Sequence, residues 1–340
     1  HHHNITLGMD FIFVNGLPFM HTKSKKINFL SILPVPSRSM AQIIKGIQTV
    51  KLVYERRGFN ITDYRADNEF NKEKIHAAIL PATMHNPAAD AHVDFIERSG
   101  RTIKESARSL CQSLPYKRYP IIMTKALMSK TIHWLNYFPS KNGVSSTMGP
   151  ATIVLGKPKP DFNKLSIPFG SFAMAYVKTT NTMKHRSVPA IALNESNEDG
   201  GYYFMSLTTG KRLHALKWKE LPIDDWVIEA VEQMAKDQEQ PVLPDKSPIF
   251  EWSPGIPIDD HEQEPVQEEH INEDDEVLSI INEDIDVDDD TDNIITDDDD
   301  TSVDDDSIDN ITEDIREEGQ EDEDDEDSNN DDDLSVDEPE

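Results

Sequence analysis

Three short stretches of the chain each place a carboxylate where the local pattern predicts the end of a strand or the start of a helix. They are LGMDFIF with Asp10, DYRADNEF with Asp67 and DFIERSGRTIKES with Glu97. Three carboxylates that converge in a fold can hold a pair of Mg²⁺ ions, and such a pair catalyses the cutting and joining of phosphodiesters. A single Asp at a strand end is more often a turn or capping residue, so the hypothesis depends on elements that bring the three together.

The first 140 residues predict such elements. Alternating apolar residues from Ile5 to Phe13 predict a strand that carries Asp10 on its other face. Asn15-Gly16 predicts a tight hairpin turn, Ser39 can cap a helix, and Gly58 can end that helix. We interpret the order of these elements as an RNase H-like plan. The predicted strands are 5–13, 17–22, 27–33, 59–66 and 75–82, and the predicted helices are 40–57, 92–112 and 117–138.

The helix predicted over 92–112 carries two stripes. Its apolar stripe is expected to be buried, with Cys111 at the buried edge. Glu97, Arg101, Lys104 and Arg108 recur at i, i+4, i+7 and i+11, so one face presents a carboxylate followed by three cations. With the neighbouring Arg98, these cations are candidates for binding DNA phosphates. The alternative is a solvated helix face. Glu69 is either a residue that supports the carboxylate site or simply exposed.

The acidity of the chain is confined to its C-terminal part. The formal net charge is -32, but residues 251–340 hold 43 of the 65 Asp and Glu and only one of the 33 Lys and Arg, Arg316. The rest of the chain is therefore basic, which favours a polyanionic partner such as nucleic acid. The acidic part has only isolated apolar residues and cannot bury a core, so we predict a disordered acidic tail from residue 237.

The region after the first 140 residues has a different texture. Residues 141–150 are expected to be a linker because they are rich in Gly and Ser. Short strands and turns over 151–222, followed by a helix over 223–236, predict a small β-barrel-like domain. The predicted fold class is thus α/β: an RNase H-like mixed five-stranded sheet with flanking helices, then the small β-domain and the tail.

In combination, these motifs resemble the integrase region of copia-type long-terminal-repeat retrotransposons. RADNEF resembles the second-aspartate motif of that family, and IERSGRTIKESARSL resembles its glutamate helix. The stretches SSTMGPATIVLGKPKPDFNKLSIPFGSFAMAYV and GGYYFMSLTTGKRLHALKWKELPI resemble the region after the catalytic core and the small C-terminal β-domain. The resemblance covers about residues 5–225. Glu97 follows Asp67 by 30 positions, which is shorter than in many integrases.

The resemblance implies a DNA 3′-processing and strand-transfer enzyme that uses two Mg²⁺ or Mn²⁺ ions. Asp10, Asp67 and Glu97 would be the metal-binding triad. The partners it implies are double-stranded DNA, both element ends and target, and further copies of the chain. It also implies synthesis and assembly in the cytoplasm and action in the nucleus. The start HHHN, without Met, is interpreted as a fragment or one piece of a polyprotein.

A second interpretation belongs to a different class. The fold could persist as a non-catalytic DNA- or chromatin-binding module whose acidic tail binds basic proteins such as histones. One cysteine excludes an internal disulfide and a multi-cysteine zinc site. No apolar run is long enough to span a bilayer, so no membrane partner is expected.

Overall fold

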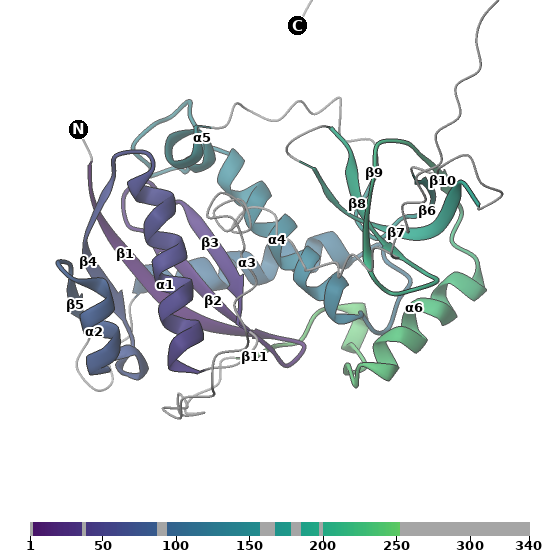
Figure 1. The fold of residues 1–340 in the computed structure, drawn as a ribbon, viewed down its shortest axis with the longest axis horizontal. Helices are drawn as coiled ribbons and strands as arrows, with labels where there is room; N and C mark the ends of the chain where they lie inside the picture. Colours follow the sequence, from purple (N-terminus) through teal and green to yellow (C-terminus); the bar gives the residue numbers. More distant parts are fainter. Residues whose placement is uncertain are drawn as a thin grey trace, which may run out of the picture. The chain divides into compact units, whose positions relative to one another are not determined.

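The computed structural model describes residues 3–35, 39–86, 94–156, 167–177, 185–196 and 200–251. Its first part is a six-stranded mixed sheet with the order β3-β2-β1-β4-β5, and β11 pairs with β1 beyond the end of β4 (Figure 1). β1, β2 and β3 are antiparallel, whereas β4 and β5 run parallel to β1. The strands are Asn4–Val14 (β1), Leu17–Ser24 (β2), Leu30–Pro34 (β3), Asn60–Ala66 (β4), Thr83–His85 (β5) and Phe250–Glu251 (β11).

Helices cover both faces of this sheet (Figure 1). The helices are Met40–Glu55 (α1), Glu73–Ile79 (α2), Asp94–Cys111 (α3), Ile121–Tyr137 (α4), Pro150–Leu155 (α5) and Asp225–Asp237 (α6). The odd-numbered residues Ile5 to Phe13 of β1 lie in one core with α1, and Ile12 and Val14 lie in a second core with α3 and α4. The strand alternation read from the sequence is therefore confirmed, and Asp10 shares the α3 side of the sheet.

The local turn and cap signals are also confirmed. Asn15 and Gly16 both have positive φ, 52° and 81°, as a two-residue hairpin turn requires. Ser39 Oγ accepts a hydrogen bond from the backbone N–H of Gln42 at the start of α1. Gly58, with φ 73°, follows the end of that helix.

The fifth strand predicted over 75–82 is wrong. Those residues form most of α2, and the fifth strand is the three-residue β5 that follows. Ile75 and Ile79 are both buried and are spaced by four, which is a helical stripe that the sequence pattern allows equally well. The Leu80-Pro81 step then ends the helix.

The boundary predicted at residue 151 is wrong as well. Residues 150–155 form the helix α5, which starts with Pro150 at its first position and ends at Gly156 in the left-handed conformation. Val154 is fully buried in the core that contains α1. This segment therefore belongs to the first sheet and its helices and not to the β-domain.

A second sheet follows, with five antiparallel strands in the order β10-β6-β7-β8-β9. Its strands are Phe172–Tyr176 (β6), Ser187–Glu195 (β7), Tyr202–Ser206 (β8), Arg212–Ala215 (β9) and Trp218–Leu221 (β10). One side of this sheet shares a continuous apolar core with α4 and α6. The Lys130 ammonium on α4 also forms a 2.8 Å ion pair with Glu195 of β7, in which both side chains are largely buried.

Residues 238–251 are ordered, in contrast to the tail predicted from residue 237. Leu243 is 3% exposed, and its N–H donates to the carbonyl of Lys117. The side-chain oxygen of Asn15 accepts from the N–H of Ile249, and β11 extends the main sheet. Proline and charge in this segment resemble a linker, but Leu243 is buried, and Ile249 and Phe250 are partly buried against the same core. Among the described residues, no helix is long and apolar enough to span a membrane.

This packing makes residues 240–251 a stabilising part of the fold. A chain that ends at Glu239 should lose about 2–4 kcal/mol of unfolding free energy, because Leu243 loses its burial and the Asn15 hydrogen bonds are broken. Urea unfolding followed by intrinsic fluorescence measures the change. A chain that ends at Glu251 is the matched control and should unfold like the full chain. Equal stability of the two truncated chains would contradict the structure.

Candidate active site

Asp10 and Asp67 lie on adjacent parallel strands at the same level of the main sheet. β1 and β4 pair in register up to Met9 opposite Ala66, so Asp10 and Asp67 are the next residues of the two strands. Asp67 is the first residue after β4 and has an extended conformation, with φ -65° and ψ 167°. Both side chains are half-buried. Parallel pairing therefore brings together two carboxylates that are 57 residues apart in the chain.

Three contacts fix the turn that carries Asp67. Phe70, in the short 3₁₀ helix Asn68–Phe70, stacks on Phe11 with ring centroids 5.0 Å apart. The side-chain amide of Asn86, just after β5, donates to the carbonyls of Ala66 and Asp67, both at 3.0 Å. Neither Phe70 nor Asn86 was a candidate from the sequence. Phe70 could have been found from its place in the DNEF motif, whereas no sequence pattern points to Asn86.

Glycine at position 8 lets α3 approach β1 closely. A Cβ atom on Gly8 would lie 2.6 Å from Cζ of Phe95, which is too close for any real contact. Gly8 precedes Asp10 by two residues and so shares its face of the sheet. The Phe95 ring at the start of α3 can therefore lie against the β1 backbone. Glu97, two residues later, is exposed, and its charge contributes to the raised pKa of Asp10.

A second contact holds α3 on the other side of Asp10. Ser99 Oγ lies 3.2 Å from Nε2 of His21, the β2 residue directly opposite Asp10. The Ser99 hydroxyl donates to the carbonyl of Ile96 at 2.7 Å, so the His21 ring must donate to Ser99 through Nε2–H. Burial, and to a lesser degree the charge of Lys23, lowers the pKa of His21 to about 3, which keeps the ring neutral. No pattern in the sequence indicates this role of His21 or Ser99.

The electrostatics of Asp10 reflect this convergence. Its pKa is raised from 3.8 to about 7, first by burial and then by the negative charge of Asp67, with smaller contributions from Glu69 and Glu97. One hydrogen bond from the backbone N–H of Phe11, at 2.8 Å, opposes the rise. Asp10 thus experiences the charge of three other carboxylates, which include both other members of the predicted triad.

The donor set suits a hard divalent cation, because Mg²⁺ and Mn²⁺ prefer carboxylate oxygens. A buried carboxylate whose pKa is raised by like charges is also the kind of group that a cation would stabilise. The described residues nevertheless contain no three His, Cys, Asp or Glu side chains close enough together to form a ready metal site. The backbone thus gathers the carboxylates, but their side chains do not have the spacing of a completed metal centre.

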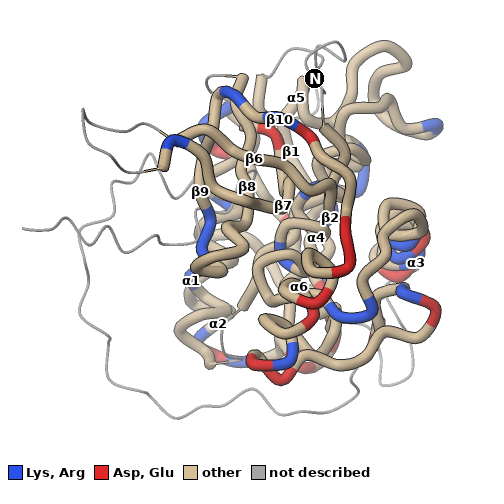
Figure 2. Tube along the Cα trace, turned by 90° about the vertical axis from the view of Figure 1, so that its right-hand side faces the viewer, with Lys and Arg blue, Asp and Glu red and all other residues tan. Residues whose placement is uncertain are grey.

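The basic stripe of α3 extends from this cluster. Arg98, Arg101 and Arg108 are exposed and Lys104 is half-buried. Figure 2 shows how the charged positions of α3 are distributed along the helix. Arg98 lies close enough to Lys23 of β2 for its charge to lower the pKa of that lysine, an effect second to burial. The ammonium of Lys104 is 6.0 Å from the ring centroid of Phe250 in β11.

Comparison with solved structures gives distant likenesses. No protein-family model and no curated protein matches the chain. Among solved structures, the catalytic core domain of BIV integrase is similar, with a TM-score of 0.34 and 15% sequence identity over 46% of this chain and 95% of that chain. The likeness is too weak to support any conclusion about activity.

The raised pKa of Asp10 predicts a pH-dependent cost of folding. The proton on Asp10 stabilises the folded chain fully below the unfolded pKa of about 3.8, and this contribution is lost as the pH rises through about 7. Without divalent cations, the unfolding free energy of Asp10→Asn relative to that of the wild type should therefore rise from pH 5 to pH 8, by about 1–2 kcal/mol after allowance for solvent screening. Chemical unfolding in EDTA at the two pH values measures this.

Asn68→Ala, on an exposed position next to Asp67, is a suitable control for this experiment. It removes no titratable group. Its substitution should change stability by the same amount at both values. A difference between Asp10→Asn and the wild type that is also constant with pH would show that Asp10 is not in the environment described.

Proposed function

We propose that the chain is an integrase-type polynucleotidyl transferase of the copia retrotransposon kind, which processes DNA 3′ ends and joins them to target DNA. The proposal is supported by the adjacent positions of Asp10 and Asp67 on paired parallel strands, and by the charges of Asp67 and Glu97, both of which raise the pKa of Asp10. The basic stripe that begins one turn after Glu97 supports it, since a reaction on DNA needs cations beside the acidic centre.

In this proposal, Asp10, Asp67 and Glu97 would hold two Mg²⁺ or Mn²⁺ ions, which when bound activate a hydroxyl nucleophile and stabilise the leaving oxygen. The protein itself orients the three carboxylates through β1, β4 and α3. Phe11 and Phe70 exclude water from behind the Asp67 turn because their rings are stacked. Neutral His21 keeps α3 in place without adding a cation that would compete for the carboxylates.

DNA would bind along α3. Arg98, Arg101, Lys104 and Arg108 would contact phosphates, and such contacts position the DNA without reading its sequence. Joining two DNA ends to a target requires more than one active site, so we also propose that the chain works as a homo-oligomer. It would act in the nucleus, on chromosomal DNA, after synthesis and assembly in the cytoplasm.

The activity can be tested directly with the full chain, Mg²⁺ and duplex DNA. Asp67→Asn and Glu97→Gln should each reduce strand transfer by at least about 100-fold, because each removes a charged ligand from a site that needs all three. Gel analysis of the joined products measures the reaction. Glu105→Gln, on an exposed position of the same helix, is the matched control and should keep full activity.

Strand transfer that survives either substitution would refute the triad, and inactivity of every variant including the wild type would leave only the binding function. That second function, a DNA- or chromatin-binding module without catalysis, is favoured by one observation: the described carboxylates do not form a ready metal site. In that case the acidic sequence after residue 251 would bind basic proteins such as histones.

The response of stability to Mg²⁺ separates the two functions. If the carboxylates form a metal site, millimolar Mg²⁺ should raise the thermal midpoint of the wild type, because a ligand that binds only the folded state stabilises it. Asp10→Asn should abolish the rise. Differential scanning fluorimetry measures both. The absence of any rise in the wild type, with Mg²⁺ or Mn²⁺, supports the non-catalytic module.

A further inference from the structure

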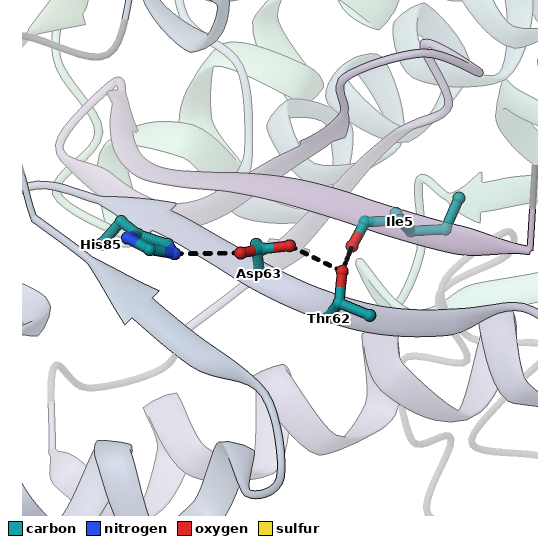
Figure 3. Close-up of polar contacts among 4 residues, drawn as sticks. All are labelled: Ile5, Thr62, Asp63 and His85. Carbon is teal, nitrogen blue, oxygen red and sulfur yellow. Dashed lines mark hydrogen bonds and ion pairs between the residues drawn. The ribbon is translucent and has the colours of Figure 1, made fainter.

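A second polar group lies on the same face of the main sheet as the carboxylate cluster. Asp63 Oδ1 is 2.9 Å from Nε2 of His85, and Asp63 Oδ2 accepts a 2.6 Å hydrogen bond from the Thr62 hydroxyl (Figure 3). The Thr62 hydroxyl also lies 3.5 Å from the carbonyl oxygen of Ile5. These contacts join β1, β4 and β5, and none of them is needed for the proposed catalysis.

The strand register places this group relative to the cluster. Gly8, Arg65 and His85 are opposite one another across β1, β4 and β5, and Asp10 and Asp67 form the next level on the same face. Same-face residues of a strand are about 6.7 Å apart, which is close to the spacing of neighbouring phosphates in a nucleic-acid strand. Arg65 and His85 therefore lie one such step from the carboxylates.

Both side chains are accessible. Arg65 is exposed, and 53% of the His85 side chain is exposed. Asp63 interacts with both side chains. Its pKa is lowered first by the hydrogen bond from Thr62, then by the hydrogen bond with His85, and also by the charge of Arg65. An ionised Asp63 accepts from Nε2–H of His85, which leaves Nδ1 as the ring nitrogen available to an outside group.

The geometry points to a phosphate-binding subsite formed by Arg65 and His85, with Asp63 as the positioning residue for the His85 ring. It rests on the proposed function and takes the phosphate next to the reacting one in the DNA strand. The Arg65 guanidinium supplies a permanent charge, and protonated His85 donates Nδ1–H to a phosphate oxygen. Thr62 fixes the second oxygen of Asp63, so that carboxylate keeps its orientation.

Binding of a short DNA duplex to the full chain, without divalent cations, tests the subsite. Arg65→Gln should weaken binding about three- to tenfold and lower the slope of log affinity against log salt by about 1, because one phosphate contact is lost. Lys236→Gln removes an exposed cation from α6 and should leave the slope within about 0.3 of the wild-type value. Fluorescence anisotropy at several salt concentrations gives both quantities.

His85 is tested by the same binding measurement at one fixed pH. His85→Gln should weaken binding of the duplex about two- to fivefold, because the contact from the ring to the phosphate is lost. The matched control is His76→Gln, whose ring is bonded to Asn71 instead.

The outcomes are distinct. Wild-type salt slopes for Arg65→Gln, or equal duplex affinities for His85→Gln and His76→Gln, would overturn the subsite while the proposed function stands. A chain that binds no duplex at any salt concentration would overturn the proposed function itself. Thermal midpoints of all variants show that they are folded, and Arg65→Lys, which keeps the charge, should recover most of the salt slope.

Discussion

The close approach of α3 to β1 at Gly8 is the constraint on which the candidate site depends. The Phe95 ring lies against the β1 backbone at the place that a Cβ atom on Gly8 would occupy. The Ser99–His21 contact then holds the helix two residues beyond Glu97, on the strand next to Asp10. These two contacts hold the start of α3 against β1 and β2, and a larger residue at position 8 would force the Phe95 ring to move.

Gathering like charges has an energetic cost that the rest of the structure must bear. The raised pKa of Asp10 measures this cost, since burial and three neighbouring carboxylates all disfavour its ionised form. The surrounding groups lower this cost only slightly, because Asp10 accepts one hydrogen bond from the Phe11 N–H and the His21 ring is neutral. Stacked aromatic rings and the Asn86 amide hold the Asp67 turn in place without adding charge. A bound divalent cation, or a proton on Asp10, would reduce the repulsion among these carboxylates.

The second sheet is attached to the first through α4 and not through a flexible linker. Apolar residues of β1 to β3, α4 and the second sheet belong to one core, and the buried Lys130–Glu195 pair joins α4 to β7. Burial alone would raise the pKa of Glu195, but the charges of Lys130 and His133 outweigh it and keep the carboxylate ionised. Breaking that pair would leave one buried charge alone, so it specifies how the two sheets pack. β11 adds a further connection, because it returns the chain to β1 after the second sheet is complete.

Elements whose signals are local could be predicted from the sequence. Side-chain periodicity and backbone preference act over a few residues, and they specify the alternation in β1, the Asn15-Gly16 turn, the Ser39 cap and the stripes of α3. Features that depend on partners distant in the chain could not be predicted in this way: α2 in place of a strand, α5 within the first core, β11 on β1, and the roles of His21, Asn86 and His85. The three carboxylates lie between these cases. Their positions at strand and helix ends could be read from the sequence, whereas their approach to one another required parallel pairing of β1 with β4 and a glycine under α3.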